Sequence, residues 1–190
     1  SNAAKLLRSD EGILTRATAP VMIGQIQLCD VPNLDEACQA LEAMASEFVE
    51  MANESAPRLV ARGGGARGFE VRRFDETPIG SMIVCHVLVD VCDAMGANLV
   101  NGMCERLAPR CEEVSGGQAF LKILSNLADR RLVYATGRVP LERIARPELG
   151  MDGATVAERI VRASVFAEVD PYRAATHNKG IMNGIDSVVL

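Results

Sequence analysis

A polar stretch near the end of the chain carries the side chains best suited to chemistry. It reads "DPYRAATHNKGIMNGID", with Lys179 four residues before Asn183 and Arg173 six residues before Lys179. In a helix, Lys179 and Asn183 would lie on one side, because four residues make about one turn. A lysine beside a carboxamide can stabilise a developing oxyanion, and an arginine can hold a carboxylate. The alternative is a solvated lysine on a helix interrupted by glycines.

A second stretch, "DVCDAMGANLVN" (90–101), places a carboxylate and small residues where a helix is expected to begin. We expect Asp93 to be the N-cap, with Ala94, Gly96 and Ala97 in the first turn. Free N–H groups and the helix dipole favour an anion at such a position, and a dinucleotide pyrophosphate would fit there. The alternative is that Asp93 only caps the helix and Gly96 only permits close packing.

Other candidate motifs are weaker. The segment "GGGARG" (63–68) lacks the following Lys-Ser/Thr of a P-loop and the spacing of a Rossmann turn, so a flexible loop is expected there. His86 stands in the middle of an apolar segment, where a histidine is usually structural, and we assign it no role. No spacing of His, Cys or carboxylate residues indicates a metal site.

Composition restricts the class of protein. The 190 residues are 48% hydrophobic and carry a net charge of −5, which is typical of a soluble globular chain and unfavourable for nucleic-acid binding. The six cysteines form no CxxC pair, which indicates reduced thiols in a cytoplasmic protein. No segment is long and apolar enough to predict a membrane span. Ser1-Asn2-Ala3 is typical of a remnant left by tag removal.

The hydrophobic periodicity predicts an α+β fold. The expected elements, in chain order, are a strand over 20–29, one amphipathic helix over 34–52 capped by Asn33, a glycine-rich loop over 58–68, a hairpin of strands over 69–76 and 81–91, a helix from Asp93 to the glycines at 116–117, and a strand over 118–126. This order is that of the ferredoxin-like βαββαβ arrangement, an antiparallel sheet with two helices on one face. A strand over 131–139 and a helix near 156–167 follow, and they have no predicted partner sheet.

Three motifs together carry a resemblance to a known family. "DAMGAN", "EEVSGGQAFLKILSNLAD" and "DPYRAATHNKGIMNGID" resemble, in order and spacing, the class II 3-hydroxy-3-methylglutaryl-CoA (HMG-CoA) reductases. The resemblance runs from about Arg8 to Leu190. It implies that residues 19–126 are an NAD(P)-binding small domain. Residues 1–18, after the tag remnant, and 127–190 would then be parts of a mostly helical large domain that binds acyl-CoA.

The resemblance also implies an activity and its residues. The family is an oxidoreductase of isoprenoid metabolism that reduces HMG-CoA to mevalonate by two hydride transfers from NAD(P)H, or runs the reverse reaction. Lys179 would be catalytic and stabilise the carbonyl oxygen and the hemithioacetal oxyanion, while Arg173 and Asn183 would hold the hydroxymethylglutaryl group. The implied cofactor-binding residues are Asp93, Met95, Gly96, Asn98 and Asn126.

The resemblance leaves the choice of cofactor open between NADH and NADPH. Ala56 stands where NAD-using members can carry an acidic residue, Glu54 is close enough to replace it, and Arg58 is able to accept a 2′-phosphate. The acidic composition slightly favours NADH. The implied partners are HMG-CoA, mevalonate and coenzyme A, together with a second copy in a homodimer, and neither nucleic acid nor membrane.

The resemblance also leads us to expect a truncated fragment without turnover, because the family's catalytic Glu, Asp and His have no counterpart within these residues. The competing hypothesis is a non-catalytic ferredoxin-like module that binds a small effector or serves in dimerisation. The two differ in whether "DAMGAN" binds a nicotinamide dinucleotide.

Overall fold

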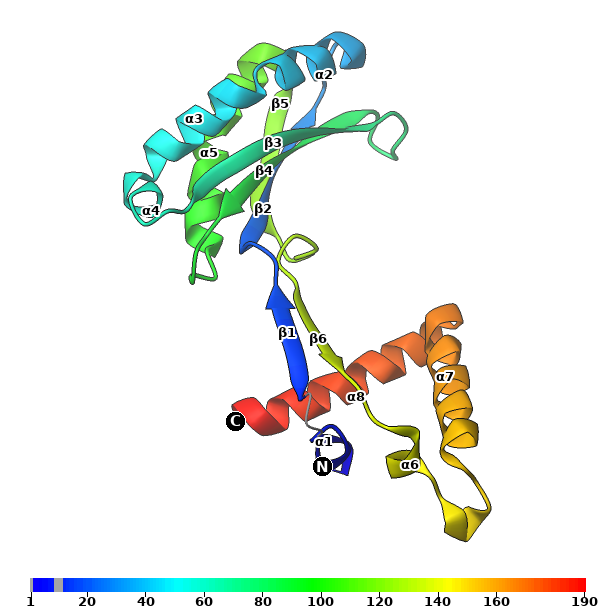
Figure 1. Cartoon of the computed structure of the whole chain (residues 1–190). Coiled ribbons are helices and arrows are strands. Elements are labelled where there is room, and N and C mark those ends of the chain that lie inside the picture. Colours follow the sequence, from blue (N-terminus) through cyan, green and yellow to red (C-terminus); the bar gives the residue numbers. More distant parts are fainter. Residues whose placement is uncertain (1, 9–11) are drawn as a thin grey trace. The chain divides into compact units, whose positions relative to one another are not determined.

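The computed structural model describes residues 2–8 and 12–190 (Figure 1). Ser1, part of the predicted tag remnant, lies outside the described residues. The chain divides into two compact units, residues 16–134 and residues 1–15 with 135–190. The predicted small domain, 19–126, falls within the first of these. Strands β1 (Ile13–Ala17) and β6 (Val133–Gly137) pair as a two-stranded sheet.

The unit 16–134 has the predicted ferredoxin-like architecture. Its strands are β2 (Val21–Cys29), β3 (Gly65–Phe74), β4 (Met82–Asp90) and β5 (Gln118–Ser125). They form one antiparallel sheet in the order β3-β4-β2-β5, with β3 and β4 joined as the expected hairpin. The helices of this unit lie on one side of the sheet, so its other side has no helix of the unit against it (Figure 1).

The first helical segment is not the single helix that the periodicity predicts. It consists of α2 (Leu34–Ala43), α3 (Ala45–Ser55) and the short α4 (Pro57–Val60). Asn33 is the N-cap, as predicted, and accepts hydrogen bonds from two backbone N–H groups of the first turn. The break falls at Met44, whose φ of −94° and ψ of 7° are not helical. It redirects the chain, and both α2 and α3 then contact β3.

The hydrophobic core lies between the sheet and its helices. Alternate residues of β2 and β4 point toward the helices, as the pleat of a strand requires. Phe48 of α3 is fully buried and stacks on Phe69 of β3, with ring centroids 4.4 Å apart. The fully buried core residues include Ile26, Leu28, Leu41, Ile83, Cys85, Val100, Cys104, Leu107 and Cys111.

Part of the glycine-rich segment predicted as a flexible loop is a strand: residues 65–68 belong to β3, whereas residues 61–64 form the turn between α4 and β3. Strand β3 begins at Gly65, and residues preceding it pack against the end of β4. A Cβ on Gly64 would lie 2.7 Å from the carbonyl oxygen of Asp90, so only glycine permits this approach. Gly65 has a φ of +119°, which L side chains rarely adopt. Gly64 therefore permits close packing against the end of β4, and Gly65 permits the positive φ at the start of β3.

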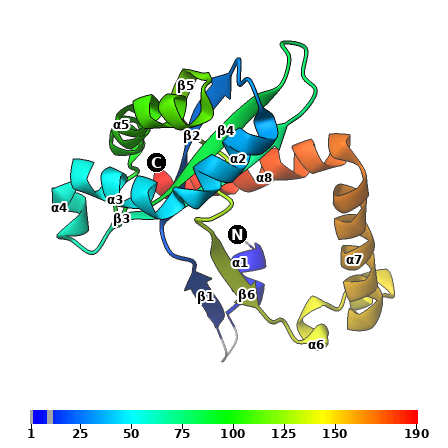
Figure 2. The ribbon, with the colours of Figure 1, turned by 90° about the horizontal axis from the view of Figure 1, so that it is seen from above.

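The second unit is helical. It contains α1 (Asn2–Leu6), α6 (Leu141–Ile144), the 3-10 helix η1 (Pro147–Leu149), α7 (Gly153–Val169) and α8 (Pro171–Val189). Figure 2 shows α7 and α8 meeting at a corner, where Asp170 caps α8 by accepting from the N–H of Arg173. In the part of the chain that the structure describes, no helix is long and apolar enough to cross a membrane.

Candidate functional site

Helix α5 (Ala97–Ser115) begins later than the sequence predicts. The N-cap is Gly96, with a φ of +88°, and Asp93 lies in the preceding turn, so the prediction that Asp93 caps this helix is wrong. No side chain caps the helix and its first turn holds no acidic residue. The first N–H groups of α5 are therefore left to solvent or a ligand, and the positive end of the helix dipole is not offset by a carboxylate there.

Two adjoining clefts lie beside this helix start. One, of about 460 Å³, is lined by Arg58, Arg62 and Asp93 among other residues. The other, of about 470 Å³, is lined by Asn98 and shares Arg58 with the first. Among the described residues, no hydrogen bond or ion pair is made by the guanidinium of Arg58 or of Arg62. The clefts thus place two unpaired cations beside an uncapped helix start, which is an arrangement suited to phosphate.

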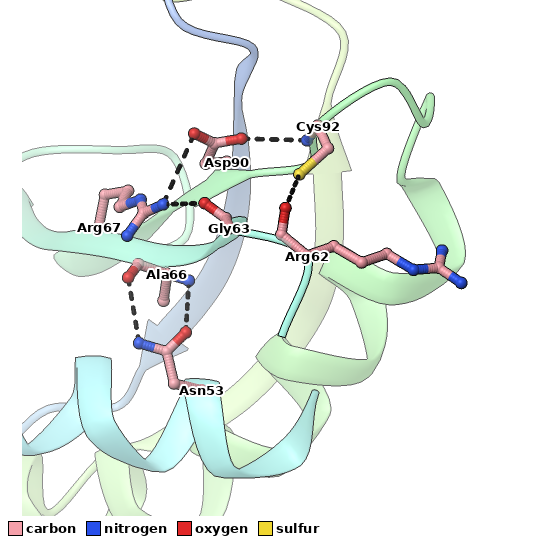
Figure 3. A network of polar contacts seen from close by, with 7 residues as sticks. All are labelled: Asn53, Arg62, Gly63, Ala66, Arg67, Asp90 and Cys92. Carbon is pink, nitrogen blue, oxygen red and sulfur yellow. Dashed lines mark hydrogen bonds and ion pairs between the residues drawn. The ribbon is translucent and has the colours of Figure 1, made fainter. Parts of the chain in front are cut away.

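A polar network holds the wall that carries Arg62 (Figure 3). The Cys92 thiol donates to the Arg62 carbonyl at 3.8 Å, and the Cys92 N–H donates to Asp90 Oδ1 at 3.0 Å. The Arg67 guanidinium donates to the Gly63 carbonyl and lies 3.8 Å from the Asp90 carboxylate. With its carbonyl held in this way, the side chain of Arg62 extends away from the network (Figure 3).

A second connection comes from α3. Asn53 Oδ1 accepts from the Ala66 N–H at 2.7 Å, and Asn53 Nδ2 donates to the Ala66 carbonyl at 3.2 Å. The two bonds join the start of β3 to the helix that leads into α4. They therefore fix α3, which precedes Arg58, relative to β3, which follows Arg62.

The sequence-predicted cofactor residues do not all line these clefts. Asp93 and Asn98 do, while Met95 is exposed between them. A Cβ on Gly96 would lie 2.5 Å from a methyl group of Val91, so Gly96 permits the tight entry to α5. Asn126 is exposed and lines neither cleft.

The loop that follows Asn126 is nevertheless tied to the same turn. The Arg131 guanidinium donates to the Ala94 carbonyl at 2.9 Å. The sequence indicates only Arg58 near the ribose position. In the structure Arg62 also lines the cleft, and Arg131 binds the turn before α5. Neither could be found from spacing, because the fold of the 58–68 segment and of the 126–132 loop decides where they lie.

The predicted catalytic residues lie on α8 in the other unit. The Lys179 ammonium donates to Asn183 Oδ1, so these two side chains share one side of the helix, as predicted. Arg173 does not join them: six residues turn a helix by about 600°, which leaves Arg173 roughly 120° around the axis from Lys179. All three side chains are exposed. Lys179 and Asn183 are joined by a hydrogen bond, and Arg173 is a separate cation.

Comparison with known proteins decides the family. A sequence profile described as hydroxymethylglutaryl-coenzyme A reductase matches residues 1–190, the whole chain. The chain belongs to the HMG-CoA reductase family. Among curated HMG-CoA reductases, that of Archaeoglobus fulgidus is 44% identical over 190 residues. A probable HMG-CoA reductase of Borreliella burgdorferi is 38% identical over 129 residues, which are 68% of this chain and 29% of that protein.

Solved structures of the family show the same fold. The class II HMG-CoA reductase of Streptococcus pneumoniae bound to NADPH, in open conformations, matches with a TM-score of 0.89 and 42% identity over 98% of this chain. Another structure of the enzyme from S. pneumoniae gives the same TM-score and identity. The chain spans 42% of the length of the A. fulgidus protein, 44% of the NADPH-bound chain and 49% of the other.

Within residues 2–8 and 12–190, no group of three or more His, Cys, Asp or Glu side chains could hold a metal ion.

Proposed function

We propose that the whole protein to which this chain belongs is an NADPH-dependent oxidoreductase that reduces the thioester of HMG-CoA to mevalonate, or runs the reverse reaction. The observation that carries this proposal is the 42% identity over 98% of the chain with a relative whose structure holds NADPH. In this proposal the unit 16–134 binds the nicotinamide cofactor and the helical unit contributes to the acyl-CoA site. When bound, the cofactor supplies the hydride.

The residues at the start of α5 fit a dinucleotide. The uncapped N–H groups of Ala97 and Asn98 would donate to pyrophosphate oxygens. Gly96 lets the start of α5 pack closely against Val91, where any Cβ would clash. Asp93, Met95 and Asn98 border the same approach, while Asn126 would reach it from the neighbouring loop.

The clefts favour NADPH over NADH. Arg58 and Arg62 both line the cleft beside Asp93, and neither guanidinium has a partner among the described residues. Glu54, which would bind the ribose hydroxyls of NADH, is exposed and is not one of the lining residues of either cleft. Two unpaired guanidinium groups suit a 2′-phosphate, which carries about two negative charges. The acidic composition that favoured NADH at the sequence level is not localised at this cleft.

In α8, Lys179 would stabilise negative charge on the thioester oxygen as hydride is added to its carbon. The Asn183 carboxamide accepts a hydrogen bond from Lys179 and thereby orients the ammonium group. Arg173 would hold the terminal carboxylate of the hydroxymethylglutaryl group. Each role is one that the family resemblance implies for that position.

We further propose a cytoplasmic homodimer. Helix α8 carries exposed apolar side chains that a second copy would cover, among them Ile181, Ile185 and Val188. All six cysteines are free thiols, which suits a reducing compartment. Light scattering coupled to size-exclusion chromatography tests the dimer.

Calorimetric titration of the chain with NADPH and NADH tests the proposed cofactor site. We expect NADPH to bind more tightly, and Arg58→Ala to weaken NADPH binding about tenfold while changing NADH binding little. The matched control is Arg106→Ala, which removes an exposed arginine of α5 outside both clefts. Equal loss of both cofactors in Arg58→Ala would contradict the 2′-phosphate role, and no binding of either would contradict the cofactor site.

A further inference from the structure

A polar pocket lies on the face of the sheet opposite the helices. It has a volume of about 380 Å³, and its polar lining consists of Gln25, Glu70, Arg72, His86, Ser125, Asp129 and Arg130. None of these residues lines the α5 clefts. In the register of the sheet, His86 of β4 stands between Glu70 of β3 and Gln25 of β2. The pocket therefore lies across all four strands, and the loop after β5 borders it.

His86 forms the buried part of this pocket. Its exposed fraction is 7%, although the sheet has no helix of its unit on this side. Gln25 Nε2 lies 2.9 Å from His86 Nε2; the amide N–H donates and the ring nitrogen accepts. The ring proton is then on Nδ1, and among the described residues Nδ1 has no hydrogen-bond partner. Burying an N–H donor without an acceptor destabilises the fold. A ligand in the pocket that accepts from this group would remove that penalty.

The charges around His86 are unevenly paired. Arg130 donates to both oxygens of Glu70, at 3.0 and 3.1 Å, so the charges of these two side chains offset each other. Arg72 lies over the ring of Phe74 at 5.6 Å, and no carboxylate within the described residues pairs with it. Burial, followed by the positive charge of Arg72, lowers the pKa of His86, while Glu70 and Asp129 act in the opposite direction. The Arg72 guanidinium and the Nδ1–H of His86 are thus among the donors of the pocket that have no acceptor within the described residues.

We propose that this pocket binds the carboxylate group of a small molecule, held by the Arg72 guanidinium and the Nδ1–H of His86. A planar guanidinium matches the two oxygens of a carboxylate. The lining holds two cationic and two anionic side chains, Arg72 and Arg130 against Glu70 and Asp129, so its formal charge is zero. A singly charged carboxylate is therefore favoured over doubly charged phosphate, which the unpaired Asp129 would repel more strongly. The site is separate from the proposed cofactor clefts and does not depend on them.

Histidine NMR of the 190-residue chain tests this site directly. The chain has two histidines, His86 and His177, so two sets of ring signals are assigned with one His177→Gln variant. Titration with acetate at constant ionic strength should move the His86 signals to saturation and raise its pKa, because a bound anion favours the imidazolium. Inorganic phosphate should bind more weakly than acetate, and chloride should give no saturable shift.

Two variants locate the binding group. Arg72→Gln changes an exposed side chain and should weaken acetate binding about tenfold, while Arg106→Gln on α5 should leave it unchanged. His86 signals that do not saturate with acetate, or that respond equally to chloride, would overturn the proposal. Tighter binding of phosphate, or unchanged acetate binding in Arg72→Gln, would also overturn it.

Discussion

Gly24 of β2 faces Cys104 of α5 so closely that a Cβ on Gly24 would lie 2.4 Å from the Cys104 sulfur and 2.7 Å from a methyl group of Val100. The close approach of this strand and helix depends on the missing side chain. Helix α5 also carries the proposed phosphate-binding N-terminus, so its seating on β2 is part of the site.

We predict that Gly24→Ala lowers the free energy of unfolding by roughly 1–3 kcal/mol, because extra volume in a packed core displaces its neighbours. Urea unfolding monitored by circular dichroism measures the change. The matched control is Gly102→Ala in α5, where nothing lies within 4 Å of the added Cβ. The control should be neutral or stabilise by up to about 1 kcal/mol. Equal effects of the two substitutions would contradict the packing described here.

Gly96 should be required for cofactor binding for a steric reason. Gly96 and Gly63 both have a φ of +88°, but a Cβ on Gly96 would lie 2.5 Å from Val91, whereas a Cβ on Gly63 would meet nothing within 4 Å. Gly96→Ala should therefore lower both the melting temperature and the affinity for NADPH. Gly63→Ala carries the same backbone strain without the clash, and it should retain most of the affinity. Similar NADPH affinities in the two variants would show that the close packing of Gly96 against Val91 is not required for cofactor binding.

The buried histidine should make stability depend on pH. Burial, followed by the charge of Arg72, lowers the pKa of His86 from its ordinary value of 6.5. Between the lowered native pKa and 6.5, the unfolded chain binds more protons than the folded chain, so the free energy of unfolding increases with pH. This stability is lost as the pH falls below 6.5.

Urea unfolding at a series of pH values measures this dependence. His86→Gln should reduce the slope in that window, and His177→Gln, at an exposed position of α8, should not. An unchanged slope in His86→Gln would mean that the imidazole is not the titrating group.

The thiols should react in two classes. Burial raises the pKa of Cys104 to about 12, and a hydrogen bond with Cys111 together with burial raises the pKa of Cys85. Since the thiolate is the reactive form, these thiols should react with an aromatic disulfide reagent only after denaturation. Cys38 and Cys92 are half-buried and should react first in the native protein. A Cys38→Ser/Cys92→Ser double variant that retains the fast phase would contradict this assignment.

Periodicity and capping are sufficient to predict most of the unit 16–134. The alternation in β2, the Asn33 cap and the αL glycine at Gly116 are local signals, and each appears as expected. The break at Met44 is not local, because it depends on how α2 and α3 pack against β3. Asp93 was misplaced as a cap because an acidic residue before a helix is the usual N-cap signal, whereas Gly96 occupies that position at positive φ.

The candidate site was predicted in part. Lys179 and Asn183 share a side of α8, since a spacing of four suffices to bring them together. The environments of Arg62 and His86 could not be predicted, because they depend on pairing between distant strands and on the path of a loop. No periodicity distinguishes a histidine in a polar pocket from one in an apolar face.

The central claim is that the start of α5 binds a nicotinamide dinucleotide phosphate. Titration of the 15N-labelled chain with NADPH, followed through backbone amide signals, tests it most directly. We expect saturable shifts that are largest at the amides of 97–99 and at residues 58–62, with smaller shifts for NADH near Arg58. Shifts confined to the opposite face of the sheet around His86, or no saturable shifts with NADPH, would contradict it.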